Sequence, residues 1–451
     1  MDKLRMSNLL IKSGRIIDPM QGIDKTADLL IKEGAIDSIE ENIDTQEGTD
    51  LINAQGKIVS PGFIDLHCHL REPGYEHKET IATGTAAAAK GGFTTICAMP
   101  NTNPVADNQA VIDFVLKKAR DEGTIRVLPI GAITKGSMGK ELTEMSELAH
   151  AGVIGFSDDG NPLEDDNIMR QALSYSSLLA LPIINHCEVP SLSIGGSINE
   201  GWISNRLGLK GNPSSSETIM AARDIELAQL TGGQIHIAHA STSGTIELVR
   251  QAKKKGINVT CEVTPHHLTL NQSVVLGNAG MNCGHAALGP DSYDQNAKVA
   301  PPLRTEEDID ALKEGLRDGS VDFIATDHAP HSQVEKFCSF QEAAFGISVF
   351  ETALGSLMSL VHSGDIPMAV LIEKMTSSPA GFLNTNLGNL KPGTTADITI
   401  IDTEAEWEVD SSAFVSKGLN TPLNNTVLKG QVIKTIFGGE IIYDAMDNTH
   451  A

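Results

Sequence analysis

Eight apolar runs follow one another between about residues 63 and 385, and helical segments fall between them. Alternation of this kind is typical of a parallel sheet whose strands are buried on both faces. The runs read GFIDLHCHL, TTICAMP, IRVLPIGAI, GVIGFSD, LPIINHCE, QIHIAHAS, NVTCEVTPHHL and VDFIATDHAP. The clearest helical segments are 79–91, 108–123, 214–232, 242–256 and 305–319. Eight such units predict a TIM (β/α)8 barrel of the α/β class, in which the chemistry lies at the C-terminal ends of the strands.

The two ends of the chain have a different rhythm, with short strand-like runs separated by polar turns. LLIKSGRIIDP and ADLLIKEGAIDSIE stand near the start, and ADITIIDTEAEWEVD and VIKTIFGGEIIYD near the end. Because chain termini often lie close together, we expect both ends to join in one small β-sandwich domain. The predicted division is residues 1–60 plus 388–451 for the sandwich and 61–387 for the barrel.

Charge and cysteine usage restrict the possible partners and compartment. A formal net charge of −24 disfavours nucleic acid and membrane surfaces, which are themselves polyanionic. The six cysteines are scattered with no CxxC pair, which favours buried thiols over a disulfide framework or a thiolate zinc site. There is no signal-peptide pattern and no apolar run of about 18 residues, so we expect a cytoplasmic protein.

Metal-ligand residue types stand where the predicted strands end. His67 and His69 close the first run, and their spacing of two places both rings on one face of a strand. The other candidates stand at the ends of later strands: Asp159 at the fourth, His186 at the fifth, His239 at the sixth and Asp327 at the eighth. Four imidazoles and two carboxylates on one rim suit Zn²⁺, and a shared carboxylate could bridge two ions about 3.5–4 Å apart.

The remaining histidines are assigned other roles. His236 and His328 are expected to be structural, as is Asp158 in its turn. His266 and His267 follow the seventh run and are more readily structural than close to the metal. A surface position is expected for His77, His150, His285, His362 and His450.

Several longer motifs carry a family resemblance that covers nearly the whole chain. They are PGFIDLHCHLREPG (61–74), GGFTTICAMPNTNP (91–104), FSDDG (156–160), INHCE (184–188), IAHAST (237–242), ATDHAPH (325–331) and KPGTTADITIID (391–402). With these motifs the chain resembles the amidohydrolase superfamily and, within it, the type I bacterial dihydroorotases. HLREPG and MPNTNP are the specific motifs, whereas HxH alone is not.

The resemblance implies a set of residues and a reaction. Its metal ligands fall on His67, His69, Asp159, His186, His239 and Asp327. They imply one or two zinc ions per subunit, and two are favoured. Its substrate-binding residues fall on Arg71, Asn101 and His331, with Phe345 and Gly346 in a loop. The implied reaction is the reversible interconversion of N-carbamoyl-L-aspartate and dihydroorotate in pyrimidine biosynthesis. Zinc would make hydroxide available near pH 7, with Asp327 as general base and then acid. We expect a homodimer, and the sequence leaves association with aspartate carbamoyltransferase open.

Two departures leave alternatives open. Related cyclic amidases carry a carboxylated lysine after the fourth strand, whereas FSDDG makes Asp159 the expected bridge here. Type I enzymes commonly read NPPLR before the eighth strand, but this chain has Ala300 in VAPPLR. The missing amide keeps a hydantoinase- or allantoinase-like cyclic amidase open. A non-catalytic scaffold is disfavoured because all six ligand positions are filled. Residues 271–300 are either an active-site lid or an ordinary solvated loop.

Overall fold

Eight parallel strands close into a barrel in the computed structural model, which describes residues 8–277 and 292–446. The barrel strands are β6 (Phe63–Cys68), β7 (Phe93–Ala98), β8 (Arg126–Pro129), β9 (Phe156–Ser157), β10 (Ile183–Asn185), β13 (Ile235–Ile237), β14 (Val259–Val263) and β15 (Phe323–Ile324). Strands β6–β8 form one sheet and β9, β10, β13, β14 and β15 form another. Parallel bridges from Gly131 to Phe156 and from Cys68 to His328 join the two sheets, so the ring is complete.

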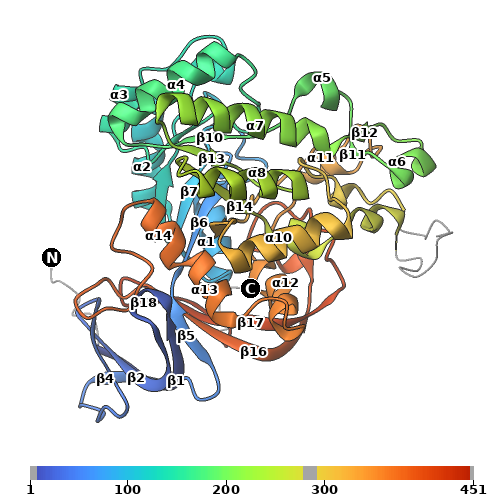
Figure 1. Ribbon diagram of the computed structural model, residues 1–451. Coiled ribbons are helices and arrows are strands. Elements are labelled where there is room, and N and C mark those ends of the chain that lie inside the picture. Colours follow the sequence, from blue (N-terminus) through green and yellow to red (C-terminus); the bar gives the residue numbers. More distant parts are fainter. Residues whose placement is uncertain (1–7, 278–291, 447–451) are drawn as a thin grey trace.

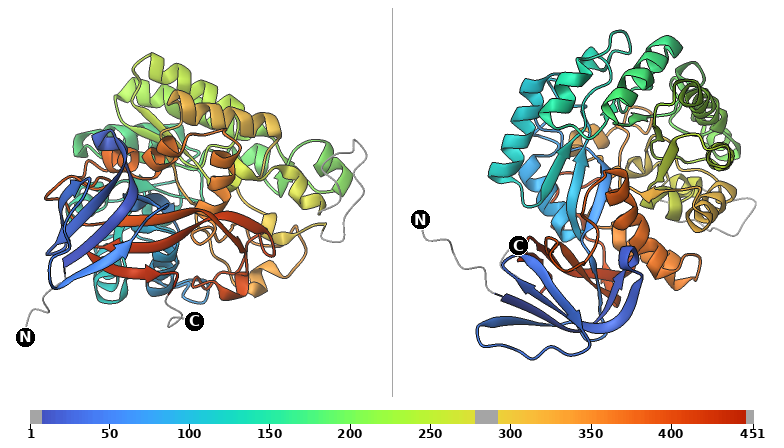
Figure 2. Two further views of the ribbon diagram at one scale, coloured as in Figure 1. Left: turned by 90° about the horizontal axis from the view of Figure 1, so that it is seen from below. Right: turned by 60° about the vertical axis from the view of Figure 1, so that its left-hand side comes forward.

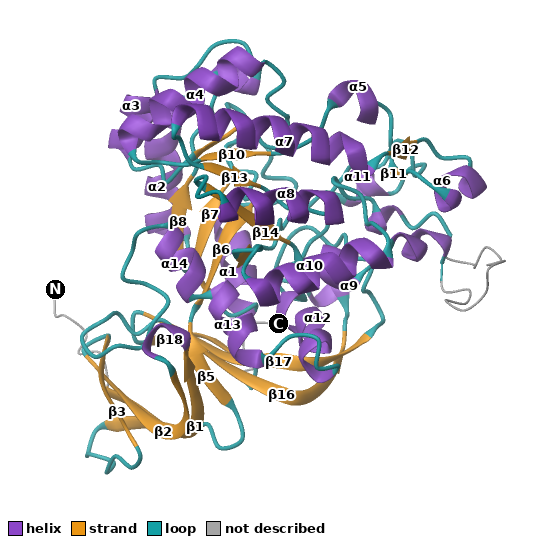
Figure 3. Cartoon of the chain, in the orientation of Figure 1, coloured by secondary structure: helices purple, strands orange, loops and turns teal. Residues whose placement is uncertain are grey.

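Helices surround these strands, as the right-hand view of Figure 2 and the colours of Figure 3 show. The longer ones are α1 (Ile81–Lys90), α2 (Gln109–Glu122), α3 (Met145–Ala151), α4 (Asp166–Leu179), α7 (Ser214–Thr231), α8 (Ser243–Lys254), α10 (Glu306–Asp318), α12 (Ala353–His362), α13 (Met368–Met375) and α14 (Ser377–Phe382). Short helices in the connections are α5 (Pro190–Ser193), α6 (Trp202–Leu207), α9 (Pro265–Thr269) and α11 (Gln333–Lys336). Side-chain caps begin several of them: the Thr80, Asn108, Thr242 and Thr305 side chains accept from backbone N–H groups of the first turn.

Both ends of the chain contribute to one further sheet, which we call the composite sheet (Figure 1). Its strands are β1 (Asn8–Asp18), β2 (Ile23–Lys32), β3 (Ala35–Glu40), β4 (Thr49–Asn53), β5 (Ile58–Pro61), β16 (Ile398–Glu408), β17 (Val427–Phe437) and β18 (Glu440–Asp444). The order is β18-β17-β16-β5-β1-β2-β3, with β4 paired to β1. Strands β5 and β16 pair antiparallel from Pro61 opposite Ile398 to Ile58 opposite Ile401, which joins the two ends of the chain.

The composite sheet curls around an apolar core of its own. Leu29, Ile31, Ile398 and Ile436 are among the buried residues of that core. An antiparallel bridge from Ala35 to Thr395 closes the curl at the far edge. The fold is therefore the expected α/β barrel with a β-sandwich built from both chain ends.

The barrel strands are shorter than the apolar runs that predict them. Strands β9 and β15 have two residues each, because the chain leaves the ladder as soon as it reaches the polar residues of the rim. A small two-stranded sheet, β11 (Ile198–Asn199) with β12 (Gly211–Asn212), lies in the connection after β10. Residues 278–291 of the lid candidate lie outside the described residues.

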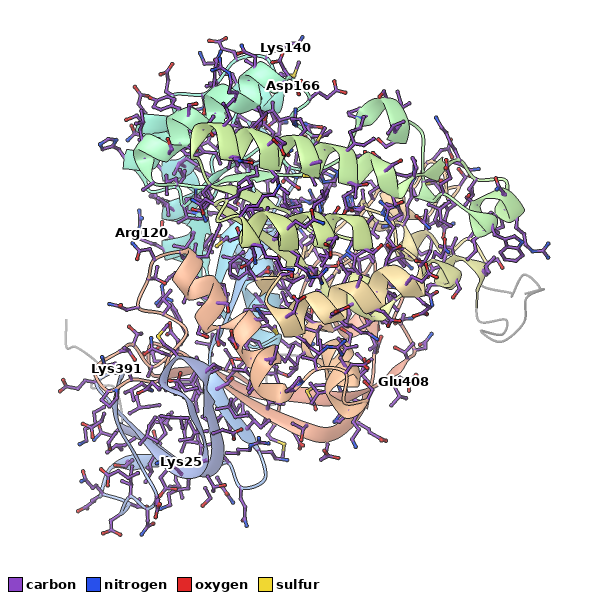
Figure 4. All side chains as sticks on the ribbon, viewed as in Figure 1. Lys25, Arg120, Lys140, Asp166, Lys391 and Glu408 are labelled. Carbon is purple, nitrogen blue, oxygen red and sulfur yellow. The ribbon has the colours of Figure 1, made fainter. Side chains whose placement is uncertain are left out.

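Charged side chains cover the outer surface, where the labelled Arg120 and Asp166 project from α2 and α4 (Figure 4). Within the described ranges, no helix combines the length and apolar character that crossing a membrane requires. The cysteines of the described chain are free, and all of them except the half-buried Cys338 are buried.

Candidate metal centre

The six residues proposed as metal ligands converge at the C-terminal end of the barrel. His67 belongs to β6 and His69 follows it, while Asp159, His186, His239 and Asp327 follow β9, β10, β13 and β15. All six side chains are buried, and His67 is completely inaccessible. The parallel strands bring these residues together because their carboxyl ends meet at one rim.

Asp159 lies at the middle of the cluster. One carboxylate oxygen, Oδ2, is 3.5 Å from His67 Nε2 and 3.6 Å from His69 Nε2. The other, Oδ1, is 3.2 Å from His239 Nε2 and 3.6 Å from His186 Nδ1. Each oxygen thus faces a different pair of imidazoles, which is the arrangement of a carboxylate that bridges two sites.

The spacing of these atoms fits a shared cation. Ligand atoms about 2.1 Å from a tetrahedral ion are about 3.4 Å apart from each other. His67 Nε2 is buried without a hydrogen-bond partner and stands 3.5 Å from both Asp159 Oδ2 and Asp327 Oδ1. Two sets, His67 with Asp159 and His239, and His67 with His69 and Asp327, each hold their ligand atoms within 4.8 Å of one another. The donor set therefore fits metal ions.

Electrostatics keeps the two carboxylates charged. Burial by itself would raise the pKa of Asp159, but the charge of His67 and contacts with His186 and His239 lower it well below its usual value. The pKa of Asp327 is likewise low, because His67 and His69 outweigh the effect of burial. Both groups are therefore anions at neutral pH, as cation binding requires.

Glu262 on β14 is a member of the site that the sequence analysis did not single out. Its Oε1 accepts from His67 Nδ1 at 2.5 Å and from the His239 backbone N–H at 3.2 Å. Its Oε2 lies 3.1 Å from His236 Nε2. A carboxylate behind a ligating histidine fixes the ring and its tautomer, leaving Nε2 of His67 free to face the centre. An acidic residue inside the apolar run VTCEV is the signal that could have identified it.

Asn101 has a comparable effect on His69. Its Oδ1 accepts from His69 Nδ1 at 3.0 Å, which directs His69 Nε2 toward Asp327 Oδ1 at 2.9 Å. The sequence analysis expects Asn101 to bind substrate, and its side chain also lines the cavity described below. One amide can do both, because its carbonyl orients the histidine and its NH₂ group remains for a ligand.

Backbone strain is concentrated in this site. Arg71, His239 and Asp327 have φ values of 64°, 34° and 45°, in the left-handed region that side chains normally avoid. Such conformations cost on the order of 1–3 kcal/mol each and persist where surrounding contacts impose them. All three side chains line the cavity described below, so the strained backbone lies at the residues that face it.

A cavity of about 510 Å³ opens over the cluster. It is lined by five of the six metal-ligand candidates and by every residue expected to bind substrate, namely Arg71, Asn101, His331, Phe345 and Gly346. Ala300, the position of the missing amide, also lines it. Its size is within the range of small-molecule sites.

Arg71 and His331 form the polar wall away from the cluster. The Arg71 guanidinium donates to Pro330 O at 3.3 Å and lies 3.4 Å from His331 Nε2. Burial, and then the Arg71 charge, lower the pKa of His331 to about 3. His331 is therefore neutral, and its Nε2 donates to Phe345 O at 2.8 Å.

The other histidines fall largely as expected. His236 is buried between Thr260 and Glu262, and His328 stacks on Phe350 at 4.1 Å. His266 and His267 are also buried, and His267 bonds Thr264 and Pro301. His77, His150 and His362 are exposed, while His285 and His450 lie outside the described residues. Asp158 accepts from the backbone N–H groups of Ile133 and Thr134, which holds the loop that follows β8.

Comparisons with known proteins agree with this geometry. Residues 56–245 match the family model described as dihydro-orotase-like. The chain is 46% identical over 436 residues to a dihydroorotase of Geobacter metallireducens, covering 97% of this chain and 99% of that one. It is 48% identical over 435 residues to a dihydroorotase of Pelotomaculum thermopropionicum, covering 96% and 98%.

Solved structures share the fold at low sequence identity. L-Hydantoinase (dihydropyrimidinase) from Arthrobacter aurescens superposes with a TM-score of 0.84 at 23% identity, over 97% of this chain and 96% of that one. A dihydropyrimidinase from Brevibacillus agri gives a TM-score of 0.82 at 21% identity, over 97% and 95%. These structures establish the architecture, and the full-length relatives establish the family. The chain belongs to the dihydroorotase family.

Proposed function

We propose that this protein catalyses the reversible hydrolysis of dihydroorotate to N-carbamoyl-L-aspartate, a step of pyrimidine biosynthesis. One observation carries the proposal: a buried arginine, Arg71, shares a cavity with the histidine–carboxylate cluster. Among the described residues Arg71 forms no ion pair, and its guanidinium donates to Pro330 O and lies 3.4 Å from His331 Nε2. A planar cation in such a position suits the carboxylate of dihydroorotate, whereas a neutral ring would leave it uncompensated.

The chain's own groups would divide the work as follows. Arg71 binds the substrate carboxylate with the Asn101 NH₂ group as a further donor, and the neutral His331 and the Phe345–Gly346 backbone form the adjoining edge. These contacts fix which carbonyl of the ring faces the cluster. Asp327 takes the proton from the attacking water and passes it to the ring nitrogen as the C–N bond breaks. In the reverse direction it returns the proton to the water that leaves.

We propose two zinc ions as the metals, held by His67, His69 and Asp327 on one side and by His186 and His239 on the other, with Asp159 between them. Zinc, when bound, polarises a carbonyl and lowers the pKa of water to about 7. The two faces of the Asp159 carboxylate, each directed at a different pair of imidazoles, support this arrangement. Elemental analysis of the purified protein tests it, with two equivalents of zinc per chain expected and a single equivalent, or another metal, against it.

The substrate test compares dihydroorotate with hydantoin and dihydrouracil on the zinc-loaded enzyme. We expect turnover of dihydroorotate only, a KM increase of at least about 100-fold in Arg71→Met, and loss of turnover in Asp327→Asn at every pH. Near-normal turnover in Asp327→Asn would refute its role in proton transfer. Preference for the neutral rings would instead favour a hydantoinase-like activity, which the apolar Ala300 in the cavity wall keeps as the second candidate.

We also propose a two-domain division at residues 1–60 plus 388–451 and 61–387, and a cytoplasmic homodimer that associates with aspartate carbamoyltransferase. The exposed apolar side chains of Val334 and Phe337, which follow His331 along the chain, support a protein contact on this side of the molecule. Size-exclusion chromatography with light scattering tests both assemblies, with and without the transcarbamoylase. A monomer that elutes separately from the transcarbamoylase would contradict them.

A further inference from the structure

We propose that two buried lysines, Lys298 and Lys336, are positioning residues whose amino groups fix the backbone of the Phe345–Gly346 edge of the cavity. The inference rests on the proposed function, because that edge adjoins the place where Arg71 and His331 are proposed to bind the substrate carboxylate. Neither lysine lines the cavity, so each would act through the segment that it holds.

Lys298 reaches this segment from the end of the 3-10 helix Gln295–Ala297, in the connection before α10. It is only 2% exposed, and its Nζ donates to Gln341 O at 2.8 Å and to Ala343 O at 2.7 Å. The same nitrogen lies 4.2 Å from the centroid of the Phe345 ring, a cation–π contact. The Lys298 carbonyl accepts from the Gly346 N–H at 2.9 Å. One residue thus contacts both ends of the short stretch from Gln341 to Gly346.

Lys336 holds the segment from α11, on the other side. It is 4% exposed, and its Nζ donates to Ala344 O at 2.8 Å, to Gln295 O at 2.9 Å and to Lys298 O at 3.3 Å. The amino group therefore ties three pieces of backbone together: the segment before Phe345, the short 3-10 helix Gln295–Ala297, and Lys298 itself.

These contacts explain why two amino groups are buried here. The segment 337–346 has no helix or strand, so its inward carbonyls have no ladder to satisfy them. A buried carbonyl without a donor destabilises the fold. Both amino groups donate to backbone carbonyls, and Lys298 also faces the Phe345 ring. Burial lowers the pKa of both, while the charge of Asp294 acts in the opposite direction on Lys336. Burying two lysine side chains away from water costs free energy. We therefore infer that the backbone they hold must keep one position.

The held backbone leads directly to the substrate side. Phe345 O accepts from His331 Nε2 at 2.8 Å, and that nitrogen stands 3.4 Å from the Arg71 guanidinium. Gly346 has φ of 143°, and a Cβ there would lie 2.6 Å from Ala329 O, so the chain passes closely against the loop that follows β15. A shift of the segment would therefore move Phe345 O and, with it, the His331 ring that stands beside Arg71.

The test uses Lys298→Met and Lys336→Met, which keep the length of the side chain and remove its donors. Lys374→Met is the matched control: Lys374 is 7% exposed and its Nζ donates to Val321 O at 2.8 Å, beside the start of β15 at the opposite end of the strand. For the two test variants we expect KM for dihydroorotate to rise at least about tenfold, with kcat within about threefold and zinc content unchanged. The control should keep the wild-type KM.

Hydrogen–deuterium exchange gives a readout that needs no substrate. Peptides that cover 337–346 should exchange at least about tenfold faster in both test variants and at the wild-type rate in the control. In Lys298→Gln, which keeps a donor group, the exchange rate should lie between those of wild type and Lys298→Met. This variant replaces Lys298→Met in the test if the methionine variant does not fold. Unchanged exchange in this segment, or an equal KM increase in the control, would overturn the inference. Wild-type enzyme inactive on dihydroorotate would instead refute the proposed function while leaving the exchange result to decide the positioning.

Discussion

Replacing Glu262 by glutamine should weaken metal binding without reshaping the barrel. The side chain keeps its size, but the carboxylate that accepts from His67 Nδ1 at 2.5 Å and from the His239 N–H at 3.2 Å becomes a neutral amide. Hydrogen bonds to a charged group contribute about 1.5–3 kcal/mol, against about 0.5–1.5 for neutral pairs, so each bond loses roughly 1 kcal/mol. Two bonds give about 2 kcal/mol, which corresponds to about a 30-fold loss of affinity.

The assay is competition between the protein and a zinc chelator of known affinity, followed by titration of the free metal. Glu217→Gln is the control, because Glu217 is also a buried glutamate and accepts from the backbone N–H groups of Ser241 and Thr242, but from no histidine. A loss between about 10- and 100-fold in Glu262→Gln alone is expected for a group that orients a ligand. A change of less than threefold in a folded Glu262→Gln protein would refute the reasoning, as would an equal loss in Glu217→Gln.

Three further outcomes are expected. Gly346→Ala should raise KM for dihydroorotate at least about tenfold, since its Cβ would lie 2.6 Å from Ala329 O; steady-state kinetics giving a wild-type KM would contradict this. Burial lowers the pKa of Lys336 from 10.5 to about 7. Between these two pH values the folded state binds fewer protons than the unfolded state, so the free energy of unfolding should rise with pH. Urea titrations from pH 6 to 10 should show less of this rise in Lys336→Met, and equal slopes would refute it. Ala300→Asn adds an amide donor to the cavity wall and should lower KM for dihydroorotate about two- to tenfold, whereas a higher KM would show that the wall has no room for it.

Much of the barrel is predictable because burial of a parallel strand leaves a strong mark on the sequence. Each of the eight apolar runs contains one barrel strand, and the five named helical segments all contain helices. The boundaries are less predictable: β9 covers only Phe156–Ser157, because hydrogen bonding across the ladder, and not apolarity, decides where a strand ends. The five named segments do not include helices α4, α12 and α13, which complete the ring of helices around the barrel.

The metal-ligand candidates could be predicted because their residue types are unusual at the ends of buried strands. The supporting groups could not, since their role depends on which strand lies beside which. Glu262 meets His67 across 195 residues of chain, a contact that closure of the ring creates. Lys298 and Lys336 likewise appear as ordinary surface residues in sequence, and only the fold of the segment before Phe345 places carbonyls around them.

The pairing of β5 with β16 has a consequence for biosynthesis. Pro61 pairs with Ile398, which is synthesised roughly 340 residues later. At ordinary rates of translation this interval is about 20–70 s. During that interval the N-terminal strands can pair with one another, but β16, which covers the free edge of β5, has not yet been made. An unpaired edge is a template for wrong association, so nascent chains that stall within the barrel should be prone to aggregate and should depend on chaperones that bind exposed strands.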